Sequence, residues 1–311
     1  MSLNIGIIFL AQVVIGSLGN FSLLSHYFFL YMSGHRSRST DLIIRHLTVA
    51  NALVILSRGI PETMTAFGLK HFLNDAGCKL VFYVHRVSRG ASIGNTCLLS
   101  VFQAITISPR NSRWAELKVK AIRYTGPSSV FCWILYMLIN TVVPMFVTEK
   151  RSEENSTATI DFGYCSSNHH DRSRDLLPSM IISTPDVLCL GLMMWASGAM
   201  VFLLYRHKHQ VRHIHRNNIS RRSSPETRAT HSILVLVSTF VSFNALSSII
   251  YLYFSFFAKT TWWLVNTSAL INACFPSISP FILLSRDPDI CKFFPMCLGR
   301  HVQFPHLIRK L

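Results

Sequence analysis

Charged residues are scarce in this chain of 311 residues, where they make up 14% of the sequence against 50% for hydrophobic residues. Soluble domains carry about 25% charged residues, so this balance excludes an ordinary soluble protein and indicates an integral membrane protein. Acidic residues are the scarcest group, with 14 Asp and Glu against 30 Lys and Arg. The basic runs lack the interleaved aromatic residues of a nucleic-acid surface, so we expect no nucleic-acid partner.

The motifs of enzymes and metal sites are also lacking. The sequence contains no Walker phosphate-binding loop, no Gly-x-Ser-x-Gly elbow and no His-Glu-x-x-His pattern. One cluster of ligand-type residues matches no zinc spacing. It consists of Asp161, Cys165, His169, His170 and Asp171. We therefore expect neither an enzyme nor a metal or other cofactor, and the lack of an internal repeat argues against the alternative of a transporter.

What the sequence does contain is a series of long apolar segments, each near the ~20 residues that a helix needs to cross a bilayer. They lie at about 5–32, 42–67, 79–108, 128–147, 177–205, 231–257 and 262–285. Together they predict an all-α membrane protein, a seven-transmembrane helix bundle formed by residues 1–285. The first segment has no basic stretch before it and exceeds the apolar core of a signal peptide, so we expect it to be retained as a span.

Basic residues are concentrated in one set of loops, and this asymmetry predicts the orientation of the chain, because Lys and Arg favour cytoplasmic loops. With the amino terminus outside, the inner set contains the loops at 110–123 and 206–228 and the tail at 286–311. The opposite orientation would place the strongly basic 206–228 loop outside. We therefore expect an outer amino terminus and a cytoplasmic tail.

The third span, from Cys78 to Pro109, carries the basic residues His85, Arg86 and Arg89 within its outer half. A charged group at that depth costs at least ~2.5 kcal/mol on insertion scales, which disfavours a lipid-facing position. We therefore expect a central helix whose outer half lines a polar cavity, the candidate ligand site. The candidate ligand-binding residues are these basic groups and the two acids within spans: His85, Arg86, Arg89, Glu62 and Asp186.

The charges inside the spans do not balance, since two carboxylates face three arginines, of which the third is Arg58. Two interpretations stay open: the arginines serve structure alone, or the cavity suits a ligand with an acceptor or anionic group. Arg58 and Glu62 lie four residues apart on one helical face, where a local ion pair with snorkelling side chains is the alternative to a ligand contact. On the central span, Gly90 and Gly94 offer a small face for close helix packing.

The longest outer loop, from Thr148 to Asp175, carries an N-glycosylation pattern at Asn155. It also contains Cys165, while Cys78 lies at the outer end of the third span, and both face an oxidising compartment. A disulfide between them would tether this loop over the cavity. Past the seventh span, a short interfacial helix is expected. The candidate sites of reversible palmitoylation in that segment are Cys291 and Cys297.

Five blocks of the sequence resemble the vomeronasal type 1 receptors, a family of pheromone receptors among the rhodopsin-like G-protein-coupled receptors. The blocks are RSTDLIIRHLTVAN at 38–51, GCKLVFYVHRVSRGASIGNTCLLSVFQAITISPRNSRW at 77–114, PDVLCLGLMMWASGAM at 185–200, HSILVLVSTFVS at 231–242 and VNTSALINACFPSISPFILLS at 265–285. The resemblance implies a plasma-membrane receptor of chemosensory neurons that binds a small pheromone-like molecule among its helices. It also implies activation of a Gi/Go-type G protein through the basic inner loops.

The sequence departs from the general rhodopsin-like pattern at several signature positions. Asn51 stands where most such receptors have an acid, and Ser279-Pro280 replaces Asn-Pro in the seventh span. The Asp-Arg-Tyr triplet of the third span and the Cys-Trp-x-Pro pattern of the sixth are missing. The usual activation switches therefore do not transfer residue by residue. A seven-span receptor for another small ligand, such as a bitter tastant, stays open as an alternative.

Overall fold

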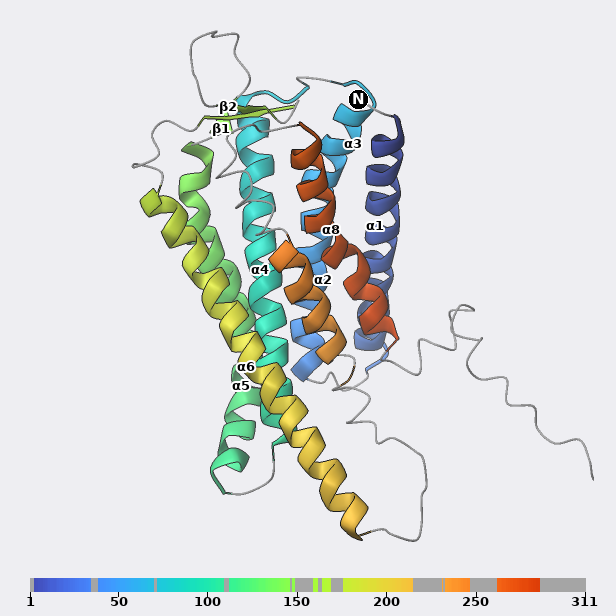
Figure 1. Cartoon of the computed structure of the whole chain (residues 1–311), viewed down its shortest axis with the longest axis vertical. Coiled ribbons are helices and arrows are strands. Elements are labelled where there is room, and N and C mark those ends of the chain that lie inside the picture. The colour runs from blue at the N-terminus through green and yellow to red at the C-terminus, as the bar shows by residue number, and fades with distance from the viewer. Residues whose placement is uncertain are drawn as a thin grey trace, which may run out of the picture.

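The computed structural model describes residues 3–34, 39–69, 72–108, 112–145, 147–148, 159–161, 164–168, 176–214, 231, 233–246 and 262–285. Six helices in these ranges are long and apolar enough to cross a membrane, and a shorter apolar helix spans Ile233–Leu246. They stand side by side in one bundle (Figure 1). The expected helical membrane bundle is confirmed, and each of the seven predicted spans overlaps one of these helices.

The helices of the bundle follow the chain in order. They are α1 (Leu3–Met32), α2 (Ser39–Val54), the π-helical turn η1 (Ile55–Gly59), α3 (Ile60–Ala66), α4 (Asp75–Ile107), α5 (Ser112–Ile139), the 3₁₀ turn η2 (Asn140–Met145), α6 (Leu176–Ile214) and α8 (Trp262–Leu284). The structure extends α5 and α6 beyond the predicted spans at their inner ends. Hydropathy marks only the part of a helix that lies in the bilayer, so it does not detect these polar extensions.

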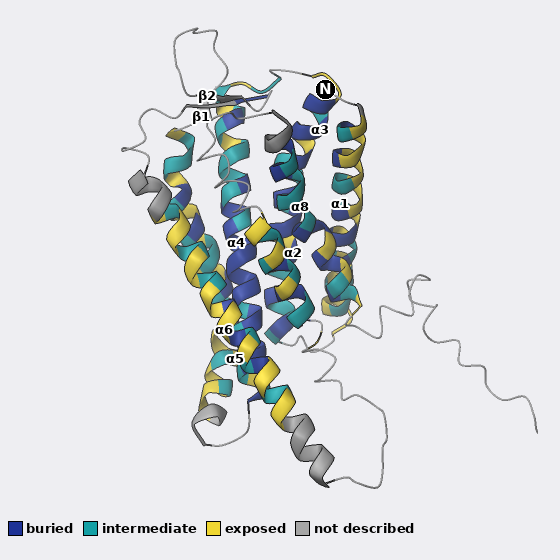
Figure 2. Cartoon of the chain, in the orientation of Figure 1, coloured by how far each residue is buried: buried dark blue, intermediate teal, exposed yellow. Residues whose placement is uncertain are grey.

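Helix α4 lies at the centre of the bundle and packs against α2, α5 and α6. Figure 2 shows α4 buried along much of its length, whereas α5 and α6 expose many residues. Large apolar side chains are exposed on the outer helices, for example Leu18 of α1, Phe131 of α5 and Trp195 of α6. Such surfaces are suited to lipid, which explains why hydrophobic residues are found on both the inside and the outside of the bundle.

Close packing between α4 and α5 depends on two glycines. A side chain at Gly90 would meet the ring of Tyr136 on α5, and one at Gly94 would meet Cys132, so only hydrogen fits at both positions. The predicted small-residue packing face on the central span is confirmed.

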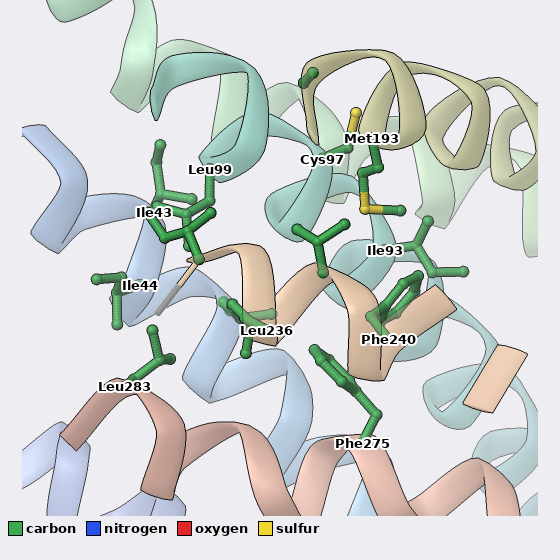
Figure 3. Close-up of a cluster of buried hydrophobic side chains, with 14 of the residues drawn as sticks. Ile43, Ile44, Ile93, Cys97, Leu99, Met193, Leu236, Phe240, Phe275 and Leu283 are labelled. Atoms are coloured by element: carbon green, nitrogen blue, oxygen red, sulfur yellow. The ribbon is translucent and has the colours of Figure 1, made fainter. Parts of the chain in front are cut away.

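An apolar core joins α2, α4, α6, α8 and the helix at Ile233–Leu246, as Figure 3 shows. At its centre, the rings of Phe240 and Phe275 meet edge to face, with their centroids 4.6 Å apart. This geometry brings the positive edge of one ring to the negative face of the other and adds to the area that the two rings bury. The core therefore fixes the helix at Ile233–Leu246 against α8.

A polar layer crosses the middle of the bundle and centres on Asn51. Its Nδ2 donates to Ser279 Oγ on α8 (2.8 Å), and its Oδ1 accepts from Ser92 Oγ on α4 (2.6 Å). On α1, Asn20 Nδ2 donates to the Pro276 carbonyl at 3.0 Å. That carbonyl cannot receive the usual helical hydrogen bond, because the residue four positions later is Pro280, which has no N–H. The side chain of α1 thus replaces a missing bond of the α8 backbone.

At the outer end of the bundle, a disulfide joins Cys78 of α4 to Cys165. This expected pairing is confirmed. It attaches a small antiparallel sheet with strand order β1-β3-β2. The strands are β1 (Val147–Thr148), β2 (Thr159–Asp161) and β3 (Ser166–Asn168). Helix α4 begins next to the disulfide, where Asn74 Oδ1 accepts from the Gly77 N–H (2.8 Å) and caps the helix.

Several predicted features lie outside the described residues. They are the glycosylation site Asn155, the palmitoylation candidates Cys291 and Cys297, the interfacial helix after the last span and the 286–311 tail. They stay predictions from the sequence.

Replacing Cys165 by serine should lower the free energy of unfolding by about 2–4 kcal/mol, because the disulfide closes a long loop in the unfolded chain. The two half-cystines are 87 residues apart. Thermal unfolding of the purified receptor in detergent measures the change. Cys274→Ser is the matched control, since Cys274 is a free thiol. An equal unfolding temperature for Cys165→Ser and Cys274→Ser would contradict this role of the disulfide.

Candidate ligand-binding site

Two adjoining cavities lie beside α4. The first has an empty volume of about 330 Å³, open mouth included, and lies between α1, η1, α3, α4 and α8. The second, of about 340 Å³, lies between α2, α4, α8 and the helix at Ile233–Leu246. Val54 and Asn272 line both. We call them the His85 cavity and the Arg89 cavity, after the α4 residue that lines each.

The Arg58–Glu62 pair lines the His85 cavity. Arg58 Nε and Glu62 Oε1 are 3.4 Å apart, and their side chains are only 17% and 3% exposed. Arg58 lies in η1, just before α3, and π-helical turns of this kind are frequent at functional sites. The local ion pair is therefore formed, but inside the bundle instead of at the interface, so the snorkelling interpretation is wrong for Glu62.

His85 of α4 is buried, with 8% of its surface exposed. Arg58, Arg86 and Arg89 all lie within electrostatic range of its ring. The Nδ1 atom has no partner among the described residues. A buried polar atom of this kind ordinarily has a partner, so its position in the wall of a cavity is informative.

Arg89 lines the second cavity together with Ser92, Asn244 and three phenylalanines. Its Nη2 donates to Asn244 Oδ1 at 3.4 Å, which connects α4 to the helix at Ile233–Leu246. A guanidinium group has five N–H donors in a planar fork, so one amide oxygen uses a small part of its capacity. The phenylalanines are Phe240, Phe243 and Phe275. The cavity thus combines an apolar wall with a strong hydrogen-bond donor.

Asp186 and Arg86 do not line either of these two cavities. Asp186 Oδ1 accepts from the Tyr136 hydroxyl at 3.0 Å. Both Arg89 and Arg86 lie within its electrostatic range. The five candidates from the sequence therefore divide: Glu62, His85 and Arg89 line the cavities, while Asp186 balances the arginines from the side of α6.

The sequence analysis missed Tyr136 and Tyr164 in this region. It pointed to polar contacts from Asn244 but not to the partner of this side chain. The only indication of Tyr136 in the sequence is indirect: Gly90 on α4 leaves space for a large side chain on a neighbouring helix. Tyr164 directly precedes Cys165, and the disulfide to Cys78 holds this part of the loop close to the helices. Nothing in the sequence pattern marks Asn244 as the partner of an arginine 155 positions away.

Tyr164 links the outer loop to the site. It is 2% exposed, and its ring stacks on Phe82 with the centroids 6.1 Å apart. Burial raises the pKa of the Tyr164 phenol, and the nearby Glu62 carboxylate raises it further, whereas Arg58 lowers it. The net direction is upward, so the hydroxyl stays protonated near the Arg58–Glu62 pair at physiological pH.

The sequence matches the vomeronasal organ pheromone receptor family over residues 3–296. The chain belongs to this family. Vomeronasal type-1 receptor 2 of Homo sapiens is 57% identical over 97% of this chain and 76% of that protein. Vomeronasal type-1 receptor 3 of the same species is 56% identical over 98% of each chain. Olfactory receptor class A-like protein 1 of Danio rerio is 32% identical over 91% of this chain and 89% of that protein.

Among solved structures, squid rhodopsin superposes with a TM-score of 0.70 over 95% of this chain and 81% of that chain, at 16% sequence identity. This similarity shows the fold of a seven-transmembrane receptor. The protein is thus a multi-pass membrane receptor of a chemosensory G-protein-coupled family, and its named relatives are receptors instead of enzymes.

Replacing Gly90 by alanine should destabilise the receptor by about 1–3 kcal/mol, the usual cost of overpacking a core. The added methyl group would push the Tyr136 ring away from α4 and strain its hydrogen bond to Asp186. Thermal unfolding measures the effect. Gly191→Ala on α6 is the matched control, since no described atom lies within 4 Å of its added methyl group. Equal unfolding temperatures for the two variants would contradict the packing role of Gly90.

Proposed function

We propose that this receptor binds a small pheromone-like molecule in the two adjoining cavities of α4 and activates a Gi/Go-type G protein. The observation that carries the proposal is that α4 presents His85 to one cavity and Arg89 to the other. Two residues four apart on a helix lie about one turn apart on the same face. A single small ligand can therefore contact both.

The chemistry of the Arg89 cavity favours an apolar molecule with an acceptor or anionic group. Aromatic side chains bury apolar surface of a ligand, while the guanidinium fixes its orientation through directed hydrogen bonds. In the His85 cavity, Glu62 would contact the ligand while it is paired with Arg58. Asp186 and Arg86 have a supporting role in this proposal, because they influence Arg89 without lining its cavity.

Signalling follows from a difference in affinity between two arrangements of the helices. A ligand shifts such an equilibrium only as far as it binds one arrangement better than the other. An acceptor group on the ligand would compete with Asn244 for Arg89 and so loosen the connection between α4 and the helix at Ile233–Leu246. The basic inner loops at 110–123 and 206–228 would meet the G protein.

Arg89→Ala should reduce the potency of anionic ligands at least tenfold, because a hydrogen bond to a charged group contributes about 1.5–3 kcal/mol. The measurement is Gi/Go activation in cells that express the receptor, challenged with anionic steroids and neutral volatile odorants, with and without pertussis toxin. Lys79→Ala is the matched control, since it removes a positive charge from a half-exposed position on the same helix.

Equal surface expression of the variants is required for the comparison. A toxin-insensitive response would contradict the Gi/Go assignment. Responses to anionic ligands that survive Arg89→Ala would contradict the role of the guanidinium while leaving the receptor assignment in place.

A further inference from the structure

Val54 of α2 lies where the His85 cavity and the Arg89 cavity adjoin. Among the described residues, only Val54 and Asn272 of α8 line both cavities. The Val54 side chain is buried, with 3% of its surface exposed. A molecule that extends from one cavity into the other therefore passes beside these two residues.

The Val54 side chain is a rigid part of this boundary. Its backbone is helical, with φ −59° and ψ −46°, directly before the π-helical turn η1. A valine in a helical backbone has one strongly preferred χ1 rotamer, because two methyl groups branch from its Cβ. The side chain therefore does not swing aside as a long, unbranched one would. On the α2 side, the two methyl groups fix the width that is available to a ligand.

The two cavities differ in the charge that they offer to a ligand. In the Arg89 cavity, the guanidinium donates to the neutral amide of Asn244 at 3.4 Å. Asp186 lies within electrostatic range of Arg89 but does not line this cavity. In the His85 cavity, Arg58 is paired with Glu62, whose carboxylate repels a second anion. An anionic group of a ligand is therefore favoured at Arg89.

The His85 cavity also offers an apolar wall. In addition to its polar residues, it is lined by Phe9, Val13, Ile55, Ala269 and Ala273. The side chains of Phe9, Ile55 and Ala269 are almost fully buried. Moving apolar surface of a ligand from water against such a wall is favourable. The apolar end of a ligand is therefore suited to this cavity.

We propose that Val54 is a specificity-determining residue of the binding site. The ligand places its anionic group on Arg89 and extends its apolar end beside Val54 into the His85 cavity. Val54 thus limits how wide the ligand is at that point. The inference rests on the proposed receptor function and adds the shape of the ligand, a narrow, elongated anion that is unbranched at its middle.

The test uses three benzoates that differ only in the group opposite the carboxylate. They are 4-methylbenzoate, 4-butylbenzoate and 4-tert-butylbenzoate. The carboxylate suits the guanidinium of Arg89, and the ring suits the phenylalanines of its cavity. The two butyl compounds are isomers that differ in width next to the ring, so the comparison keeps charge and carbon number constant. Binding is measured by ligand-dependent thermal stabilisation of the purified full-length receptor in lipid nanodiscs.

Two substitutions change the width at Val54. Val54→Ala removes both methyl groups, whereas Val54→Ile adds one carbon and also serves if the alanine variant fails to fold. The matched control is Val13→Ala, which removes the same two methyl groups from a residue that lines the His85 cavity alone. Arg89→Ala tests the position of the carboxylate.

We expect the wild-type receptor and Val13→Ala to bind 4-butylbenzoate about tenfold more tightly than its tert-butyl isomer, because the wide group meets Val54. In Val54→Ala the ratio should fall to about twofold or less. In Val54→Ile the straight chain should lose its advantage over 4-methylbenzoate, since the passage is narrower. Arg89→Ala should weaken the binding of all three benzoates.

Several results would overturn the inference. Equal affinity of the wild-type receptor for the two isomers would do so, as would a tenfold ratio that survives in Val54→Ala. A ratio that Val13→Ala lowers as much as Val54→Ala would show general loosening of the site instead of a boundary at Val54. Binding that Arg89→Ala leaves unchanged, or no binding of any benzoate, would contradict the placement of the anion on Arg89.

The inference and the signalling proposal fail in different ways, because Gi/Go activation by the same benzoates is measured separately in cells. Isomer-selective binding without any Gi/Go response would leave the role of Val54 in place and contradict the signalling proposal. A Gi/Go response that both isomers elicit with equal potency would leave the signalling proposal in place and contradict the role of Val54.

Discussion

The cost of burying positive charge inside a membrane protein determines how this bundle is arranged. Arg58, Arg86 and Arg89 lie in the outer halves of the spanning helices. A guanidinium in an apolar interior is tolerated only with charged or hydrogen-bonding partners. Arg58 forms an ion pair with Glu62. Arg89 donates a hydrogen bond to Asn244 and also lies within electrostatic range of Asp186. Each of these partners belongs to a different part of the bundle. The charges therefore hold the outer halves of the helices around α4.

This arrangement also explains why the two cavities lie beside the charged residues of α4. Where charges meet, side chains are held apart by the geometry of their hydrogen bonds, which leaves room between them. The apolar core is formed by buried hydrophobic side chains, which can pack closely against one another. Phe240 and Phe275 stand between these regions, because they belong to the core and also line the Arg89 cavity. A change at the cavity can thus reach the inner half through two rings that touch.

The sequence predicted the features that depend on one segment at a time. The apolar segments, the small face at Gly90 and Gly94, and the outer cysteines all follow from local composition and the compartment that each segment reaches. The partners of the charges could not be predicted in this way. Tyr136 is an ordinary residue of an apolar span, and Asn244 is a polar residue whose partner the sequence does not identify. Only the packing of the helices brings Tyr136 to Asp186 and Asn244 to Arg89.

The position of α8 follows from its prolines and completes the walls of both cavities. Pro280 removes the helical donor of the Pro276 carbonyl, and Asn20 of α1 takes its place. In the same way, Pro276 cannot donate to the carbonyl of Asn272, one turn further out. Asn272 lines both cavities, so the backbone irregularity lies where they meet. Near its prolines, α8 lacks backbone hydrogen bonds of its own and is held instead by the hydrogen bond from Asn20 of α1. The wall that joins the two cavities therefore depends on the contact between α1 and α8.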